Sequence, residues 1–308
     1  MNMLEELNFK NEKSFRLIKM YEKLNKGEVL YKKELTNMFC VSEKTLLRDI
    51  SDLRVYYANT SMKLESIVYD KKINGYYLKD NDSHWMTNQE ILAICKVILE
   101  SRAFNLKELK ILIDKLLQLA SPINNEEIRG IINKELFYYV PLKHNQNLLQ
   151  RLWDITLFIN HKEFIEIAYT RKDGVTKNHE IKPVALMFSE YYFYIIAYMA
   201  DESKKDPTVF RVDRIKEIRS TNKHFRTPYS EEFNDGEFRK RVQFMFTGKL
   251  QKVKFEFSGA SVESILDKLP TAEIINEKDG IYTMVAESYG EGIYMWLRAQ
   301  GDIVKVIS

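Results

Sequence analysis

The N-terminal part of the chain is organised around the stretch Val41-Ser42-Glu43-Lys44-Thr45-Leu46-Leu47-Arg48-Asp49-Ile50. Ser42 is a favourable helix N-cap, and Val41 before it can pack against Leu46 within the helix, which fixes the angle at which the helix begins. Apolar residues then recur at intervals of four, three and four, which predicts one buried helix face. These residues are Leu46, Ile50, Leu53 and Tyr57.

The rest of this predicted helix surface carries Lys44, Thr45 and Arg48 near its start. Two helix-like stretches, residues 12–24 and 31–39, come before it, and the connection to it is tight. In a helix-turn-helix, the second helix enters the DNA major groove with its N-terminal residues against the base edges. We therefore expect DNA contacts from Ser42, Lys44, Thr45 and Arg48.

A hairpin is predicted directly after this helix. Residues 64–70 read as a strand, residues 71–75 as a turn that contains Asn74 and Gly75, and residues 75–78 as a returning strand. Such a hairpin is a candidate wing, and we expect Lys71 and Lys72 at its tip to contact phosphates. The alternative is a helix pair and a hairpin with a purely structural role.

Together the two motifs resemble the winged helix-turn-helix of DeoR-like regulators, through residues 41–50 and through Asn74-Gly75-Tyr76-Tyr77-Leu78. The chain departs from that family at Cys40, where a turn glycine is common, and at Lys44, where a second arginine is common. The resemblance implies a DNA-binding domain over residues 1–80. These residues hold 15 Lys and Arg against 12 Asp and Glu, whereas the rest of the chain holds 32 of each, so the small positive excess lies here.

Residues 85–158 read mostly as helices with apolar stripes. One stripe contains Ile91, Leu92, Cys95, Ile98 and Leu99, and another contains Leu109, Leu112, Ile113, Leu116 and Leu117. Pro122 and Pro141 interrupt the pattern. We interpret residues 81–160 as a helical connector. We expect a homodimer, because one recognition helix reads few base pairs and paired heads match two half-sites. The connector is the favoured dimer interface, and a contribution from the C-terminal extension is the alternative.

From Phe164 the period changes from helical to strand-like, and Lys172-Asp173-Gly174 indicates a hairpin turn. Further strands are predicted at residues 179–188, 191–199 and 210–218. This density of short strands is typical of a small barrel or a strongly curved sheet.

This part of the chain resembles the WYL domain through three blocks. They are Ile181-Lys182-Pro183-Val184-Ala185-Leu186, Phe193-Tyr194-Ile195-Ile196-Ala197-Tyr198 and Phe210-Arg211-Val212-Asp213-Arg214-Ile215, of which the last is the most specific. Phe193-Tyr194-Ile195 stands for the eponymous triplet, and Thr208 lies in a stretch where the family often has an arginine. The resemblance implies a small Sm-like β-barrel at residues 161–227 that senses ligands, followed by a ferredoxin-like α/β extension at residues 228–308.

Arg211 is the first candidate for an anionic ligand and Arg214 the second, because a guanidinium binds phosphate or carboxylate through a planar fork. The two arginines are three apart in a predicted strand, so we expect them to face opposite sides, with one of them pairing with an acid such as Asp213. Aromatic stacking or hydroxyl donation is expected from Tyr169, Tyr194 and Tyr198, for which a role in the core or at the surface is the alternative. Lys182 completes the predicted ligand residues.

Composition excludes several other classes. A chain of 308 residues exceeds one typical core, and 45% hydrophobic with 30% charged residues indicates a globular protein. Cys40 and Cys95 are isolated, which favours a reducing, cytoplasmic compartment, and no apolar stretch is long enough for a membrane span. The five histidines lack metal-ligand spacing, and Tyr289-Gly290-Glu291-Gly292 lacks the third glycine of a dinucleotide loop. No enzymatic motif, metal or cofactor is therefore expected.

The sequence predicts an α+β multidomain protein that binds operator DNA as a dimer and responds to an anionic effector, either single-stranded nucleic acid or a nucleotide. The alternative is an accessory protein whose WYL-like region binds RNA or single-stranded DNA as its main task. Effector identity, operator sequence and the direction of regulation are left open.

Overall fold

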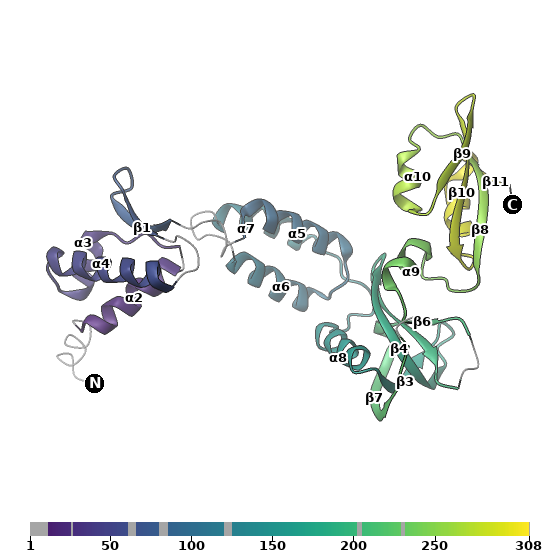
Figure 1. Cartoon of the computed structure of the whole chain (residues 1–308), viewed down its shortest axis with the longest axis horizontal. Helices are drawn as coiled ribbons and strands as arrows, with labels where there is room; N and C mark the ends of the chain where they lie inside the picture. The colour runs from purple at the N-terminus through teal and green to yellow at the C-terminus, as the bar shows by residue number, and fades with distance from the viewer. Residues whose placement is uncertain are drawn as a thin grey trace. The chain divides into compact units, whose positions relative to one another are not determined.

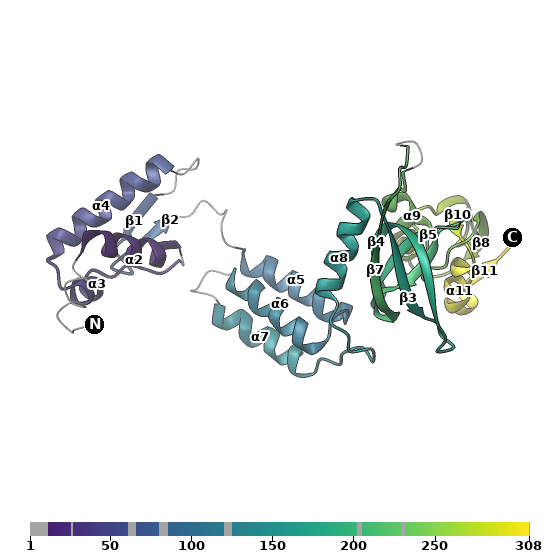
Figure 2. The ribbon, with the colours of Figure 1, turned by 90° about the horizontal axis from the view of Figure 1, so that it is seen from below.

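The computed structural model describes residues 12–25, 27–60, 66–79, 86–119, 125–201, 205–228 and 232–307. The chain forms two compact units, one within residues 1–100 and 109–140 and the other within residues 101–108 and 141–308. Figures 1 and 2 show the elements of both units, and each unit is described by itself.

Among the described residues, the first unit begins with three helices and a hairpin (Figure 1). These are α2 (Lys13–Asn25), α3 (Lys32–Phe39), α4 (Glu43–Thr60) and the antiparallel pair β1 (Ser66–Asp70) and β2 (Gly75–Lys79). The predicted apolar face of α4 is confirmed, since Leu46, Ile50, Leu53 and Tyr57 are all buried in one core with residues of α2 and α3. The first residues of the expected strand, 64 and 65, lie outside the described residues.

The connection between α3 and α4 is as short as predicted. Cys40 ends α3 with φ +52°, in the left-handed region that glycine adopts most easily. A residue with a Cβ atom there costs about 1 to 2 kcal/mol. The departure from glycine at this position therefore places a strained residue in the turn.

Three further helices follow: α5 (Asn88–Ser101), α6 (Leu106–Gln118) and α7 (Asn125–Phe137). The predicted stripes are confirmed by the buried positions Ile91, Cys95, Leu99, Leu109, Ile113 and Leu117. Salt bridges from Lys96 to Glu135 and from Arg129 to Asp114 join α7 to the other two helices. Pro122 lies outside the described residues.

The second unit contains α8 (Leu149–Asn160) and a five-stranded antiparallel sheet in the order β6-β5-β4-β3-β7. The strands are β3 (Glu163–Thr170), β4 (Thr176–Ser189), β5 (Tyr192–Met199), β6 (Thr208–Arg211) and β7 (Ile215–His224), and a 3-10 turn, η2 (Val212–Arg214), lies between the last two. The expected barrel is wrong, because β6 and β7 are opposite edges of an open sheet among the described residues. Alternation along a strand reveals its faces but not whether its sheet closes.

Both faces of this sheet are apolar. One face packs with α8 around Ile165, Ile195 and Phe210. The other packs around Ile196 and Met187 with Phe238 of α9 (Asp235–Arg241). Successive residues of β5 alternate between these two cores, so the position of a residue on β5 decides on which face of the sheet its side chain lies.

A second antiparallel sheet follows, in the order β11-β8-β10-β9. Its elements are β8 (Leu250–Phe257), α10 (Glu263–Lys268), β9 (Glu273–Lys278), β10 (Ile281–Tyr289), α11 (Gly292–Ala299), η4 (Gly301–Ile303) and β11 (Val304–Val306). The element order is that of a split β-α-β unit. Gly292 is required by packing here, because a Cβ atom would lie 2.0 Å from the Gln243 carbonyl oxygen.

Among the described residues, no helix is long and apolar enough to cross a membrane. The same residues include no group of three or more His, Cys, Asp or Glu side chains placed to hold a metal ion.

Candidate nucleic-acid and ligand sites

The start of α4 is capped as predicted. The Ser42 hydroxyl accepts a hydrogen bond from the Thr45 amide at 3.2 Å and shares a second one with the Thr45 hydroxyl at 2.9 Å. Thr45 is half-buried, whereas Lys44 and Arg48 are exposed. Within the described residues, neither Lys44 nor Arg48 has an ion-pair partner, so both cations are available to a phosphate or a base edge.

The acidic residue beside Arg48 is neutralised internally. Asp49 accepts from Arg16 Nε at 2.7 Å and from Arg16 Nη2 at 3.2 Å, and both side chains are almost fully buried. Sequence reasoning missed this pair. Its signal was the position of Arg16, which precedes the buried Met20 and Leu24 at four-residue spacing.

The β1–β2 hairpin, predicted above as a candidate wing, is fixed to the helices by specific contacts. Arg54 of α4 donates from Nε to the Ile67 carbonyl oxygen at 2.8 Å, and the Lys32 ammonium lies 5.3 Å from the centre of the Tyr69 ring. At the tip, Lys71 and Lys72 are exposed and have no ion-pair partner among the described residues. The structure thus places the six predicted DNA contacts at the start of α4 and at the tip of the hairpin that follows it.

The predicted ligand arginine Arg211 already has an internal partner. Its Nε and Nη2 donate to the two carboxylate oxygens of Asp213 at 3.0 and 2.8 Å, and its guanidinium carbon lies 3.3 Å from the centre of the Tyr192 ring. Burial is the largest single effect on Arg211 and lowers its pKa, but the hydrogen bonds and the charge of Asp213, together with Tyr192 and Tyr194, raise the pKa overall. The expectation that one arginine pairs with Asp213 is confirmed, and Arg211 is that arginine.

Arg214 lies in the turn η2 and not in a strand, so the argument from strand alternation is wrong. No hydrogen bond or ion pair to Arg214 is present among the described residues, although its side chain is half-buried. Tyr194 faces Arg211 across the β5–β6 pair. Burial raises the pKa of Tyr194, with Arg211 and Arg214 acting in the opposite direction, so its hydroxyl is a protonated donor beside two cations.

The turn that carries Asp213 is tied to α8 and α6. Arg151 of α8 donates to the carbonyl oxygens of Val212 at 3.3 Å and Ile215 at 2.7 Å. Buried Glu108 accepts from the Leu148 amide at 2.9 Å, at the start of α8. These contacts fix Arg211 and Arg214 relative to the first residues of α6.

His144 lies close to the Tyr192 ring on which Arg211 stacks. Its ring lies 6.3 Å from that of Tyr192, and its Nδ1 accepts from the Gln146 amide at 3.0 Å. Burial lowers the pKa of His144, and the charge of Arg211 acts in the same direction, while Asp213 opposes it. Neither Tyr192 nor His144 was predicted from the sequence, because neither follows a motif.

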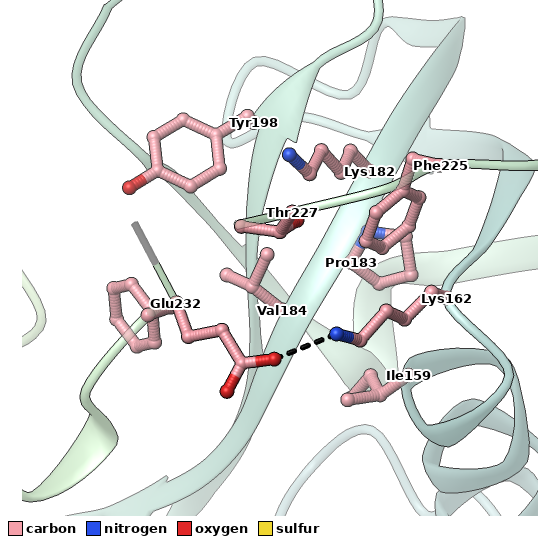
Figure 3. A pocket seen from close by; sticks show the side chains of 10 residues that line it. Ile159, Lys162, Lys182, Pro183, Val184, Tyr198, Phe225, Thr227 and Glu232 are labelled. Carbon is pink, nitrogen blue, oxygen red and sulfur yellow. Dashed lines mark hydrogen bonds and ion pairs between the residues drawn. The ribbon is translucent and has the colours of Figure 1, made fainter. Parts of the chain in front are cut away.

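The remaining predicted ligand residues are not all in one place. Lys182 and Tyr198 are register partners on β4 and β5, in a pocket that also contains Lys162 and Glu232 (Figure 3). Tyr169 instead packs edge-on against Phe210 in the core on the α8 side of the sheet. The structure therefore divides the six predicted residues among three places: the pocket with Lys182 and Tyr198, the end of the β5–β6 pair with Tyr194, Arg211 and Arg214, and the core with Tyr169.

Comparison with known protein families finds a match for part of the second unit. The family model described as the WYL domain matches residues 152–220, which confirms the resemblance seen in the three sequence blocks. No curated protein matches the chain.

Two solved structures are similar at low levels. Proteasome accessory factor B/C (PafBC) of Arthrobacter aurescens is 15% identical, with a TM-score of 0.30 over 95% of this chain and 44% of that chain. A structure described as a CRISPR Cas-related protein is 11% identical, with a TM-score of 0.34 over 87% of this chain and 69% of that chain. The chain thus spans less than half the length of the first protein, and neither likeness is close enough to support an argument about function.

Proposed function

We propose that this chain is a DNA-binding transcription regulator, with a DeoR-like winged helix-turn-helix that reads operator DNA and a WYL domain that binds an anionic or nucleic-acid effector. The observation that carries the proposal is the start of α4, where Lys44 and Arg48 are exposed and have no acidic partner among the described residues, beside the buried Arg16–Asp49 pair. The occurrence of this surface in one chain with a WYL match supports a regulator over a structural helix pair.

In this proposal, α4 enters the major groove with Ser42, Lys44, Thr45 and Arg48 towards the bases and phosphates. Lys71 and Lys72 contact phosphates from the wing. Phosphate contacts supply affinity and depend strongly on salt, whereas an arginine that binds a base edge supplies discrimination.

The effector site is proposed at Arg211, Arg214 and Tyr194. Asp213 holds part of the Arg211 guanidinium, so Arg214 and the remaining Arg211 donors bind the anion while the Tyr194 hydroxyl donates to it. Single-stranded nucleic acid is favoured over a nucleotide, because rings beside cations supply stacking and charge together. Effector binding shifts the equilibrium between two arrangements of the protein. This requires that the effector bind one arrangement more tightly than the other.

A homodimer is part of the proposal. Phe137 and Tyr138 are 81% and 79% exposed, and their rings pack edge to face at 5.0 Å where α7 ends. Two aromatic rings this exposed are suited to burial between two copies of the connector. We further propose that the protein acts in the cytoplasm by binding rather than by catalysis, and that the split β-α-β unit is the ferredoxin-like extension.

The second candidate is an accessory protein that binds RNA or single-stranded DNA as its main task. It is favoured by the stacking of the Arg211 guanidinium on the Tyr192 ring. An aromatic ring beside a cation can bind nucleic acid with little dependence on which base stacks there.

Sequencing the nucleic acid that co-purifies with the protein from cells separates the two candidates. The proposal expects enrichment of duplex DNA with a defined sequence motif. Recovery of single-stranded nucleic acid alone, without a duplex motif, would favour the accessory role.

A further inference from the structure

A pocket of about 180 Å³ lies at the end of the β4–β5 pair that Lys182 and Tyr198 occupy, away from Arg211 and the η2 turn that follows it. Figure 3 shows Lys182, Tyr198 and Phe225 around its upper part and Lys162 and Glu232 below them. Tyr198 and Tyr194 are four residues apart on β5, which separates them by about 13 Å. The pocket is therefore a place distinct from the effector site proposed above.

Lys182 is the cation of the pocket that has no acidic partner among the described residues. The Lys182 ammonium lies 4.9 Å from the centre of the Phe225 ring and 5.9 Å from that of Tyr198. No carboxylate of the described residues lies within ion-pair distance of it. A half-buried ammonium that lies over ring faces, with no hydrogen bond or ion pair among the described residues, keeps donors for an outside acceptor.

The second cation, Lys162, is held in place from its backbone. It follows α8 with φ +51°, its amide donates to Ile159, and its carbonyl oxygen accepts from the Phe225 amide at 2.8 Å. Glycine is the usual residue at such a helix end because a side chain is strained there. A lysine at this position therefore keeps an ammonium at the pocket at a cost in backbone energy.

Glu232 is the internal anion of the pocket. Its Oε1 accepts from Lys162 Nζ at 2.6 Å, while both side chains are almost half exposed. An ion pair this exposed contributes little stability, so an outside anion can replace the carboxylate at a small cost in free energy. When Glu232 turns away, the pocket presents two ammonium groups and the aromatic rings of Tyr198, Phe225 and Phe233.

We propose that this pocket binds a phosphate monoester, whose phosphate displaces Glu232 from Lys162 and bridges Lys162 and Lys182. A volume of 180 Å³ is below the range of drug-sized sites, so the phosphate and a few attached atoms enter while the rest of the ligand extends outward. The phosphate belongs either to a free mononucleotide or to the end of an oligonucleotide, and both present the same chemistry. The inference rests on the sensing role proposed above. Its test uses no operator DNA, so the phosphate site and the proposed DNA-binding function can each fail independently.

The test measures binding to the full chain by calorimetry, with inorganic phosphate, a nucleoside 5′-monophosphate, and one oligonucleotide with and without a 5′-phosphate. We expect the monophosphate to bind, K182Q to weaken it at least tenfold, and E232Q to strengthen it severalfold because the competing charge is gone. K177Q is the matched control on the same strand, since Lys177 is exposed and lies outside the pocket, and it should bind like the parent.

A preference for the 5′-phosphorylated over the 5′-hydroxyl oligonucleotide assigns the ligand to strand ends, and equal binding of the two assigns it to free monophosphates. The proposal is overturned if no phosphate compound binds, or if K182Q behaves like K177Q. Because K182Q can also perturb folding, E232Q provides an independent criterion. A loss of affinity in E232Q would show that the carboxylate supports the site instead of occupying it.

Discussion

The carboxylate of Asp49 is buried against the guanidinium of Arg16, with two hydrogen bonds that join α4 to α2. The two residues are 33 positions apart in the sequence, and Asp49 directly follows Arg48 in α4. The pair therefore fixes the rotation of α4 about its axis and, with it, the direction in which Lys44 and Arg48 point.

Removing one partner of this pair is expected to destabilise the N-terminal unit. D49N removes the buried carboxylate charge that accepts both hydrogen bonds from Arg16, which costs about 3 to 5 kcal/mol. D52N, one turn further along α4, removes an exposed partner of Lys13 and should cost less than about 1 kcal/mol. Urea unfolding followed by the fluorescence of a probe on α4 measures both, and equal effects would contradict the structural role of the pair.

Arg211 and Arg214 are expected to differ in their effects on stability but not on effector binding. R211A leaves the carboxylate of Asp213, whose side chain is only 5% exposed, without its partner, which destabilises the fold by about 3 kcal/mol. R214A removes a cation with no partner among the described residues, so its effect on stability should be within about 0.5 kcal/mol.

Both arginine variants should weaken binding of a single-stranded oligodeoxynucleotide, as measured by fluorescence anisotropy. R211K separates the two roles of Arg211, because it keeps the charge but loses the two-pronged contact with Asp213. Unchanged binding in both R214A and a folded R211A would remove the proposed effector site.

Acidification is expected to loosen the region around His144. Its pKa in the folded protein is below the usual 6.5, first because of burial, so the unfolded chain takes up the proton more readily. Stability therefore falls as the pH drops through the interval just below 6.5, and it is restored as the pH rises. Protonation also removes the acceptor that His144 Nδ1 offers to the Gln146 amide. An NMR titration of the His144 ring checks the direction, and a pKa at or above 6.5 would contradict it.

The proposed dimer depends on the exposed rings at the end of α7. Replacing both in F137E/Y138S removes apolar contact area and adds a charge, which should shift the mass measured by light scattering from dimer to monomer. Y31S is a suitable control, because Tyr31 is also exposed but lies before α3. A parent protein that is monomeric both free and on DNA would refute the dimer itself.

Local features of the sequence predicted the local structure well. The spacing from Leu46 to Tyr57 identified the buried face of α4, and Ser42 identified where the helix begins. The three blocks between residues 181 and 215 indicated a resemblance to the WYL domain, whose family model matches residues 152–220. In each case the information lies within a few residues, on the scale of a helix turn or a strand repeat.

Features that depend on distant residues were missed or wrong. Hydrophobic alternation did not show that the sheet stays open, and it did not reveal the 3-10 turn that removes Arg214 from the strand. The pairing of Arg16 with Asp49 and of Lys162 with Glu232 spans 33 and 70 residues. Such contacts follow from the packing of whole elements, which no short spacing in the sequence encodes.

The central claim is that the chain reads duplex DNA through the start of α4. In vitro selection of random duplexes by the full protein, followed by anisotropy on the selected sequence, tests it most directly. The account predicts a defined motif with two half-sites about one helical turn apart, and a steep loss of affinity with salt.

In the same measurement, R48A should weaken binding to the selected duplex by about 1 to 3 kcal/mol and relax sequence preference at one base position. R239A, which removes an exposed arginine of α9, serves as the matched control and should bind like the parent. Failure to select any duplex, or an R48A affinity equal to that of R239A, would contradict the account.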